Sequence, residues 1–213
     1  MFDITQIITE LALVAVPLLM GITFHEVAHG YTAYRFGDPT AKNAGRLTLN
    51  PIKHLDPLGT LVLVVTRMIG WAKPVPINPA YFEDPRKGIF WVSLAGPAAN
   101  FCLAAGFYVL FYVLLMFQSM FAGGSLEPLL GTALAICFYG ILLNIILGIF
   151  NLIPIPPLDG SKILATFMPG SMAGQYMQLE KYGFLIIILL VFLGVFQGLF
   201  GFVINLVYSL VLI

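Results

Sequence analysis

The stretch from Ile7 to Tyr34, IITELALVAVPLLMGITFHEVAHGYTAY, is a long apolar run that contains two histidines and two glutamates. A helix that crosses the hydrocarbon core of a bilayer needs about 20 predominantly apolar residues, and this run is long enough. Placing a charge at the centre of such a helix costs about 2.5 to 3.5 kcal/mol, so ionisable residues there usually serve a function. The stretch therefore predicts a transmembrane helix that carries a functional site.

The composition of the whole chain is typical of a membrane protein. Of 213 residues, 60% are hydrophobic and 9% are charged, whereas soluble domains are roughly half apolar and a quarter charged. Ten basic and ten acidic residues cancel, so the net charge does not indicate a nucleic acid or an acidic partner. We therefore expect a lipid bilayer around the chain and no nucleic acid, and the oligomeric state stays open.

Four apolar runs are long enough to span a bilayer. They are Ile7 to Tyr34, Ile89 to Phe117, Leu129 to Phe150 and Leu185 to Ile213. No flexible linker, low-complexity tract or internal repeat divides the sequence. We predict an all-α polytopic membrane protein with about four full transmembrane helices, folded as a single membrane-embedded domain over residues 1–213.

Two further segments modify this outline. Leu58 to Ile69 is too short for a comfortable span, so we interpret it as a re-entrant or interfacial helix. In the last apolar run, the glycines favour close approach of a neighbouring helix over a bend. They are Gly194, Gly198 and Gly201.

Basic residues indicate which side of the membrane each loop faces. Four of them follow the first run, namely Arg35, Lys42, Arg46 and Lys53, and no Lys or Arg precedes it. Because loops rich in Lys and Arg stay in the cytoplasm, we expect this loop to be cytoplasmic. His25, ten residues before Arg35, would lie about 15 Å below that surface. We predict a bacterial or archaeal cell membrane, with an organelle as the alternative, and a site nearer the cytoplasmic face.

The segment His25-Glu26-Val27-Ala28-His29 places two histidines four residues apart with a glutamate after the first. On a helix both imidazoles share one face and can bind a single zinc ion at about 2.0 to 2.1 Å. Glu26 projects to the side where a metal-bound water could sit, which suits a general base. The alternative is a buried polar cluster that only packs helices together. Spacing and depth together favour zinc.

A hydrolytic zinc site has three protein ligands and one open position, so a third ligand must come from elsewhere. Asp159 ends the segment NLIPIPPLD, residues 151–159, whose prolines break the preceding helix. Irregular backbone at membrane depth usually lines a site. His54 lies in a charged loop, where a histidine is usually solvated or part of a turn. We rank Asp159 above His54, which stays a candidate for a supporting contact.

These motifs are similar to those of the site-2 protease family of intramembrane zinc metalloproteases. They are His25-Glu26-x-x-His29, the segment from Asn151 to Asp159-Gly160, and Gly96-Pro97-x-x-Asn100. The resemblance covers nearly the whole chain and fits the compact members of the family, which lack PDZ and CBS modules.

The resemblance implies one zinc ion held by His25, His29 and Asp159, with Glu26 as general base. It also implies that Asn151 contacts the substrate carbonyl or the oxyanion, whereas Asn100 is a weaker candidate.

The same resemblance implies hydrolysis of peptide bonds in or near transmembrane segments of membrane-protein substrates. The segment from Trp71 to Pro79 resembles membrane-associated β-strands of the family, which are thought to receive an unwound substrate as an added strand. We therefore expect a small β-element there, with a rigid surface loop as the alternative.

The main functional alternative is a membrane metal transporter or metal sensor, and a catalytically silent scaffold is a third. A transporter would need a polar path across the whole bilayer, and few ionisable residues lie in the outer halves of the apolar runs.

Overall fold

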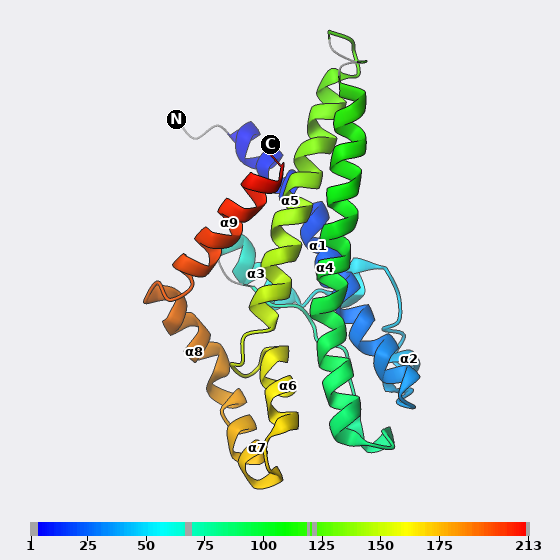
Figure 1. Cartoon of the computed structure of the whole chain (residues 1–213), viewed down its shortest axis with the longest axis vertical. Helices are drawn as coiled ribbons and strands as arrows, with labels where there is room; N and C mark the ends of the chain where they lie inside the picture. Colours follow the sequence, from blue (N-terminus) through cyan, green and yellow to red (C-terminus); the bar gives the residue numbers. More distant parts are fainter. Residues whose placement is uncertain (1–3, 67–69, 119, 121–122, 212–213) are drawn as a thin grey trace.

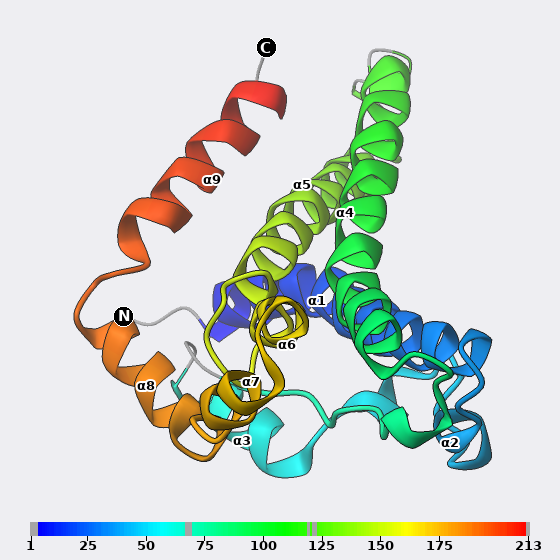
Figure 2. The same cartoon turned by 60° about the horizontal axis from the view of Figure 1, so that its bottom comes forward.

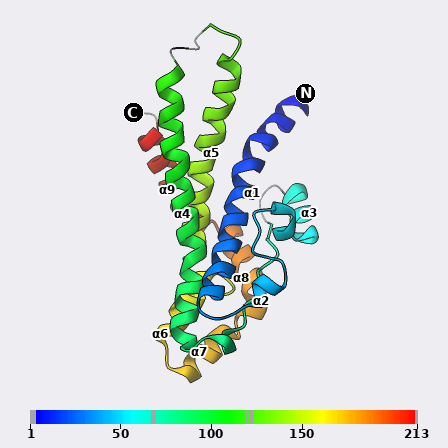
Figure 3. The same ribbon diagram turned by 90° about the vertical axis from the view of Figure 1, so that its right-hand side faces the viewer.

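Three long helices form the centre of the molecule (Figure 1). In the computed structural model, which describes residues 4–66, 70–118, 120 and 123–211, they are α1 (Ile4–Arg35), α4 (Pro85–Gln118) and α5 (Glu127–Asn151). Each contains a stretch long and apolar enough to cross a membrane. Helices α4 and α5 run side by side, and α1 packs against both (Figure 3). These helices make the chain an integral membrane protein.

The other helices that the structure describes are shorter. They are α2 (Thr40–Asn43), η1 (Pro51–His54), α3 (Pro57–Thr66), η2 (Pro79–Tyr81), α6 (Asp159–Phe167), α7 (Gly170–Met177), α8 (Glu180–Phe192) and α9 (Gln197–Val211). With 10 residues, α3 is too short to span a membrane. Its re-entrant or interfacial placement stays a prediction, and the last three residues of the predicted segment, 67–69, lie outside the described residues.

An apolar cluster joins α4, α5 and α9. Its buried members are Phe107, Phe111, Cys137, Ile141, Val203, Val207 and Val211. At Gly140 of α5, an added Cβ would lie 2.4 Å from the Phe107 ring, so only glycine lets the two helices approach this closely. Within a bilayer, such dense packing of small against large residues is a main source of helix association.

The last apolar run does not form one continuous helix, which corrects the prediction. Helix α8 ends at Phe192 and α9 begins at Gln197, and the chain turns between them (Figure 2). Gly194 lies in this turn with φ +73°, a left-handed conformation that readily ends a helix at glycine. At Gly198 and Gly201 an added Cβ would meet nothing within 4 Å. The expected role of these glycines in close helix packing was therefore wrong.

The number of spans depends on how the broken helices are counted. Three of the described helices meet the requirements for a span by themselves. A fourth exists if α7 and α8, which are bent by 59° at a short break, together form one span. The described helices therefore provide three or four spans, against a prediction of about four.

The segment over residues 71–78, called the strap below, is extended but forms no strand. Within the described part of the chain, the pairing near it is a single isolated antiparallel bridge between Leu55 and Ala72. Pro74 and Pro76 have no N–H to donate, so they interrupt a β-ladder. The expected β-element was wrong for this reason.

Candidate metal centre

Helix α1 places His25, Glu26 and His29 next to α4 and α6. The two histidines are one helical turn apart, and both are at most 9% exposed. Gly96 of α4 faces them, because an added Cβ at this position would lie 2.4 Å from Nε2 of His29. The absence of a side chain at Gly96 therefore leaves the space in which the imidazoles lie.

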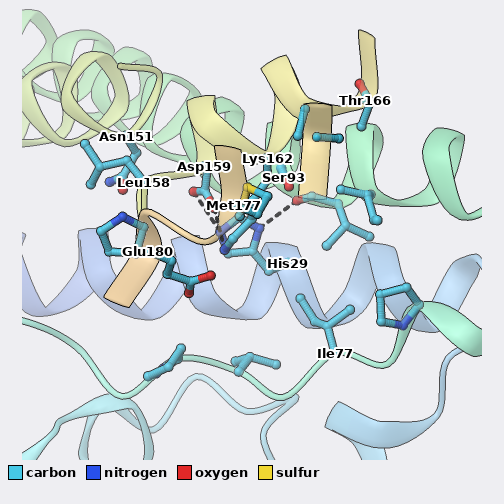
Figure 4. A pocket seen from close by; sticks show the side chains of 18 of the residues that line it. His29, Ile77, Ser93, Asn151, Leu158, Asp159, Lys162, Thr166, Met177 and Glu180 are labelled. Carbon is cyan, nitrogen blue, oxygen red and sulfur yellow. Dashed lines mark hydrogen bonds and ion pairs between the residues drawn. The ribbon is translucent and has the colours of Figure 1, made fainter. Parts of the chain in front are cut away.

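Asp159 reaches the histidines from the first turn of α6. The proline-rich segment after Asn151 ends α5, and α6 then begins at Asp159, whose carboxylate lies beside His29 of α1 (Figure 4). Oδ2 of Asp159 lies 3.1 Å from Nε2 of His25 and 3.1 Å from Nε2 of His29. The two Nε2 atoms are 2.9 Å apart. The structure thus brings the three predicted ligands to one point, and Figure 4 shows His29 and Asp159 there.

Hydrogen bonds on the far side of each ring determine which nitrogen faces Asp159. Nδ1 of His29 lies 2.6 Å from the carbonyl oxygen of Val92, which can only accept, so this nitrogen carries the proton. Nδ1 of His25 lies 2.7 Å from Oδ1 of Asn100. Both Nε2 atoms therefore present lone pairs to the same point, together with a carboxylate oxygen. Such groups repel one another unless a cation lies between them, so this donor set fits a metal ion such as Zn²⁺.

Asn100 of α4 connects the site on α1 to one more spanning helix, α5. Its Nδ2 donates to the carbonyl of Gly21 at 3.1 Å and to Oδ1 of Asn144 at 3.0 Å, which leaves its Oδ1 for His25. Asn144 donates in turn to the carbonyl of Gly140 at 2.8 Å. Asn100 and Asn144 are both fully buried.

Sequence reasoning ranked Asn100 low and missed Asn144. The sequence does contain an indication of Asn144, which is a lone amide inside the apolar run of α5. A polar side chain in such a run usually bonds to another helix.

Glu26 is half-buried and faces a large cavity beside the histidines. Its Oε2 accepts a hydrogen bond from the backbone N–H of Val75 in the strap, at 2.8 Å. The cavity has a volume of about 960 Å³ and extends from the three predicted ligands past the strap to α7 and α8. This is at the upper end of the volumes of ligand sites, about 300 to 1,000 Å³.

Besides the three predicted ligands and Glu26, the charged residues in the wall of this cavity are Arg86, Lys162 and Glu180. Nζ of Lys162 is 3.5 Å from Oδ1 of Asp159. Asn151 also lines the cavity (Figure 4). The Nδ2 of Asn151 donates to the carbonyl of Leu147 at 3.0 Å. An amide has a second N–H, so Asn151 can still donate into the cavity.

His54 lies at the end of η1, does not line the cavity and is fully buried, so of the two expected alternatives the structure excludes a solvated residue and supports one in a turn. Its Nε2 bonds to the carbonyl of Thr48 at 2.8 Å, and its own carbonyl accepts the N–H of Lys73 at 2.9 Å. His54 therefore supports the start of the strap and does not contact the predicted ligands.

Asp38 fixes the other end of the strap. Its carboxylate accepts the backbone N–H of Asn78 at 2.7 Å, and it also accepts the N–H and the hydroxyl of Thr40. Burial by itself would raise the pKa of Asp38, but the hydrogen bonds from Thr40 and Asn78 outweigh it and hold the pKa below its ordinary value. The carboxylate is therefore ionised at neutral pH and holds the strap to the loop that follows α1.

The chain is similar in sequence to several known proteins. The family model described as peptidase family M50 matches residues 120–196, which include Asp159. The chain is 43% identical over 176 residues to "Putative zinc metalloprotease YwhC" of Bacillus subtilis, covering 82% of this chain and 78% of that protein. It is 33% identical over 181 residues to "Putative zinc metalloprotease Rip2" of Mycolicibacterium smegmatis, covering 81% of this chain and 63% of that protein.

A more distant match, 25% identical over 176 residues, is "Zinc metalloprotease MJ0392" of Methanocaldococcus jannaschii, covering 82% of this chain and 37% of that protein. No solved structure matches the chain. The motifs, the helices that carry them and the extent of the similarity to YwhC lead to one conclusion: this chain belongs to peptidase family M50, the site-2 protease family.

Proposed function

We propose that this chain hydrolyses peptide bonds of other membrane proteins within the bilayer, with His25, His29 and Asp159 as ligands of one zinc ion and Glu26 as general base. Membership of the family makes the chain a metalloprotease that uses Zn²⁺. The observation that carries the assignment of ligands is the approach of three donor atoms to within 3.1 Å of one another, inside a helical bundle.

The residues around this point have complementary tasks. When bound, zinc would supply a Lewis acid and a water whose pKa is lowered to about 7. Glu26 would take a proton from the attacking water and pass it to the leaving amine. The free N–H of Asn151 would donate to the oxygen of the scissile carbonyl as negative charge develops on it. The histidines keep the orientation that Asn100 and Val92 give them.

The position of the site suggests the class of substrate. The cavity lies against α1 at the depth of the apolar helices, so a transmembrane segment could reach it from the bilayer. Every backbone group in a spanning helix is bonded internally, so that segment must unwind before its carbonyl is accessible. We therefore expect substrates with helix-weakening residues near the cleavage site.

The same proposal includes orientation and domain organisation. Arg35 ends α1 and the basic loop follows it, which supports a cytoplasmic location for the end of the molecule nearest the site. We place the chain in a bacterial or archaeal cell membrane and treat residues 1–213 as a single membrane-embedded domain. A metal transporter or sensor is not favoured, because the relatives are metalloproteases by description.

Cleavage by reconstituted protein tests the proposal. The purified chain is placed in liposomes with a membrane-protein substrate, and native protein, Glu26→Gln and Asp159→Ala are compared for cleavage and zinc content. We expect Glu26→Gln to keep zinc and lose at least about a hundredfold in rate. We expect Asp159→Ala to lose both zinc and cleavage. Unchanged cleavage by Glu26→Gln would remove the general base from the proposal, and unchanged zinc in Asp159→Ala would remove the ligand.

A further inference from the structure

The strap contacts the rest of the molecule mainly through its backbone. The N–H of Lys73 donates to the carbonyl of His54, and Arg46 donates to the carbonyls of Lys73 and Pro74, at 2.6 and 3.3 Å. Arg46 is 6% exposed, so its guanidinium is held in place where it meets these strap carbonyls. These contacts hold the strap to the loop that follows α1. The strap is therefore a fixed part of the cavity wall.

Among the strap N–H groups with a described partner, that of Val75 is the one that donates to α1. It lies between Pro74 and Pro76, which have no N–H, so these three consecutive residues provide one donor. That donor is bonded to Oε2 of Glu26 at 2.8 Å. The flanking prolines leave no neighbouring amide that could replace it if the strap moved by one residue.

The side chain of Val75 keeps this amide in register with Glu26. It is 7% exposed, and an added Cβ at Gly30 of α1 would lie 3.0 Å from its Cγ1. Gly30 follows Glu26 by one helical turn, so the strap is seated on the same face of α1. The packing of Val75 on Gly30 and its hydrogen bond to Glu26 therefore both fix the position of the strap on α1.

Without the hydrogen bond from Val75, the carboxylate of Glu26 would be free to rotate. Its Oε1 has no hydrogen-bond partner among the residues that the structure describes. The cations Arg86 and Lys162 lie in the wall of the same cavity and would attract a carboxylate that is free to rotate. A general base must stay within hydrogen-bonding reach of the proton that it takes.

We infer that Val75 is a positioning residue, whose backbone N–H holds Oε2 of Glu26 and leaves Oε1 directed to the cavity for proton transfer. This inference rests on the proposed role of Glu26 as general base. It also gives the strap a task other than pairing with an added substrate strand, because the prolines leave residues 74–76 with no other amide to offer.

The test is to remove the N–H while keeping an extended backbone. Val75→Pro does this, because Val75 precedes Pro76 and is already restricted to extended conformations. Val75→Ala is the matched variant, since it removes both γ-methyl groups of the buried side chain and keeps the N–H donor. We expect kcat to fall about tenfold to a hundredfold in Val75→Pro, with KM within about threefold and zinc content native. We expect Val75→Ala to keep most of the native kcat.

A second proline variant controls for a general effect on the strap. Lys73→Pro removes the N–H that bonds to His54 and leaves Val75 intact. We expect it to lower the melting temperature with a much smaller loss of kcat than Val75→Pro. If Val75→Pro does not fold, the ester analogue of Val75, which replaces only the N–H by oxygen, is measured in its place.

The outcomes separate this inference from the proposed function. Native kcat in Val75→Pro, or an equal loss in Val75→Ala, would overturn the positioning role while Glu26→Gln stays inactive. A higher KM with unchanged kcat would show that the strap amide binds substrate, which also overturns it. If Glu26→Gln cleaves normally, the proposed function itself fails.

Discussion

Single hydrogen bonds at the site determine what each ionisable group can do. The imidazole of His25 could expose either nitrogen, and the 2.7 Å contact with Asn100 selects Nε2 for the side that faces Asp159. Partners of this kind orient a ligand and raise its basicity, and their loss typically weakens metal binding about tenfold to a hundredfold. Asn100 is therefore expected to matter for zinc affinity although it does not contact the ion position.

Replacing Asn100 with alanine tests this at the scale of one residue. We expect Asn100→Ala to bind zinc about tenfold to a hundredfold more weakly than native protein, measured by competition with a chromogenic chelator. Asn144→Ala is the graded control. Asn144 bonds to Asn100, at 3.0 Å, and Asn100 in turn bonds to His25, so this variant should lose less zinc affinity. Equal affinity in native protein and Asn100→Ala would contradict the orienting role.

At the scale of elements, the site requires α4 to pass very close to the histidines of α1. Gly96 permits this, and the same helix contains Gly106, where an added Cβ would meet nothing within 4 Å. Both glycines lie in the interior of α4, so alanine at either position has the same intrinsic benefit for the helix, about 1 kcal/mol. The difference between them is the contact with His29.

Alanine at the two positions should therefore have different effects. We expect Gly96→Ala to displace the His29 ring, because the new Cβ would lie 2.4 Å from Nε2, and to lose zinc and cleavage together. Gly106→Ala should keep native zinc content and native rate. Both are measured in the same reconstituted assay, and zinc retained at native level in Gly96→Ala would show that α4 can shift away from α1.

For the whole molecule, the proposed zinc site joins segments that are far apart in the sequence. The histidines belong to α1 and Asp159 begins α6, 130 residues after His29. A ligand that binds only the folded state stabilises it by about 2.7 kcal/mol at a concentration a hundred times the Kd. Removal of zinc should therefore loosen the end of the molecule that contains the cavity.

Chelation gives a direct measure of this connection. We expect a strong chelator to lower the melting temperature of the native protein in detergent by about 5 to 10 °C, and added zinc to restore it. Asp159→Ala should melt at the same temperature with and without the chelator. A native melting temperature that the chelator does not change would mean that no structural metal is bound in this state.

Local patterns in the sequence were enough to predict the helices and to nominate the ligands. The lengths of the apolar runs predicted the three long helices, and the spacing of His25 and His29 put both on one face of α1, because helical periodicity depends only on neighbouring residues. The prolines before Asp159 marked it as a candidate because they break the preceding helix, which is also an effect of neighbouring residues. Zinc binding by these residues stays a prediction, whereas their meeting at one point is a property of the structure.

Tertiary structure alone decided which distant groups complete the site. Asn100 is 75 residues from His25, and Val75 is 49 residues from Glu26. No local pattern specifies such pairs, because they depend on how α4 and the strap pack on α1. The predicted strand failed because prolines remove ladder donors, and the predicted last helix failed because Gly194 can adopt a left-handed turn. The sequence determined the chemistry that is available, and the packing of helices determined which of those groups meet.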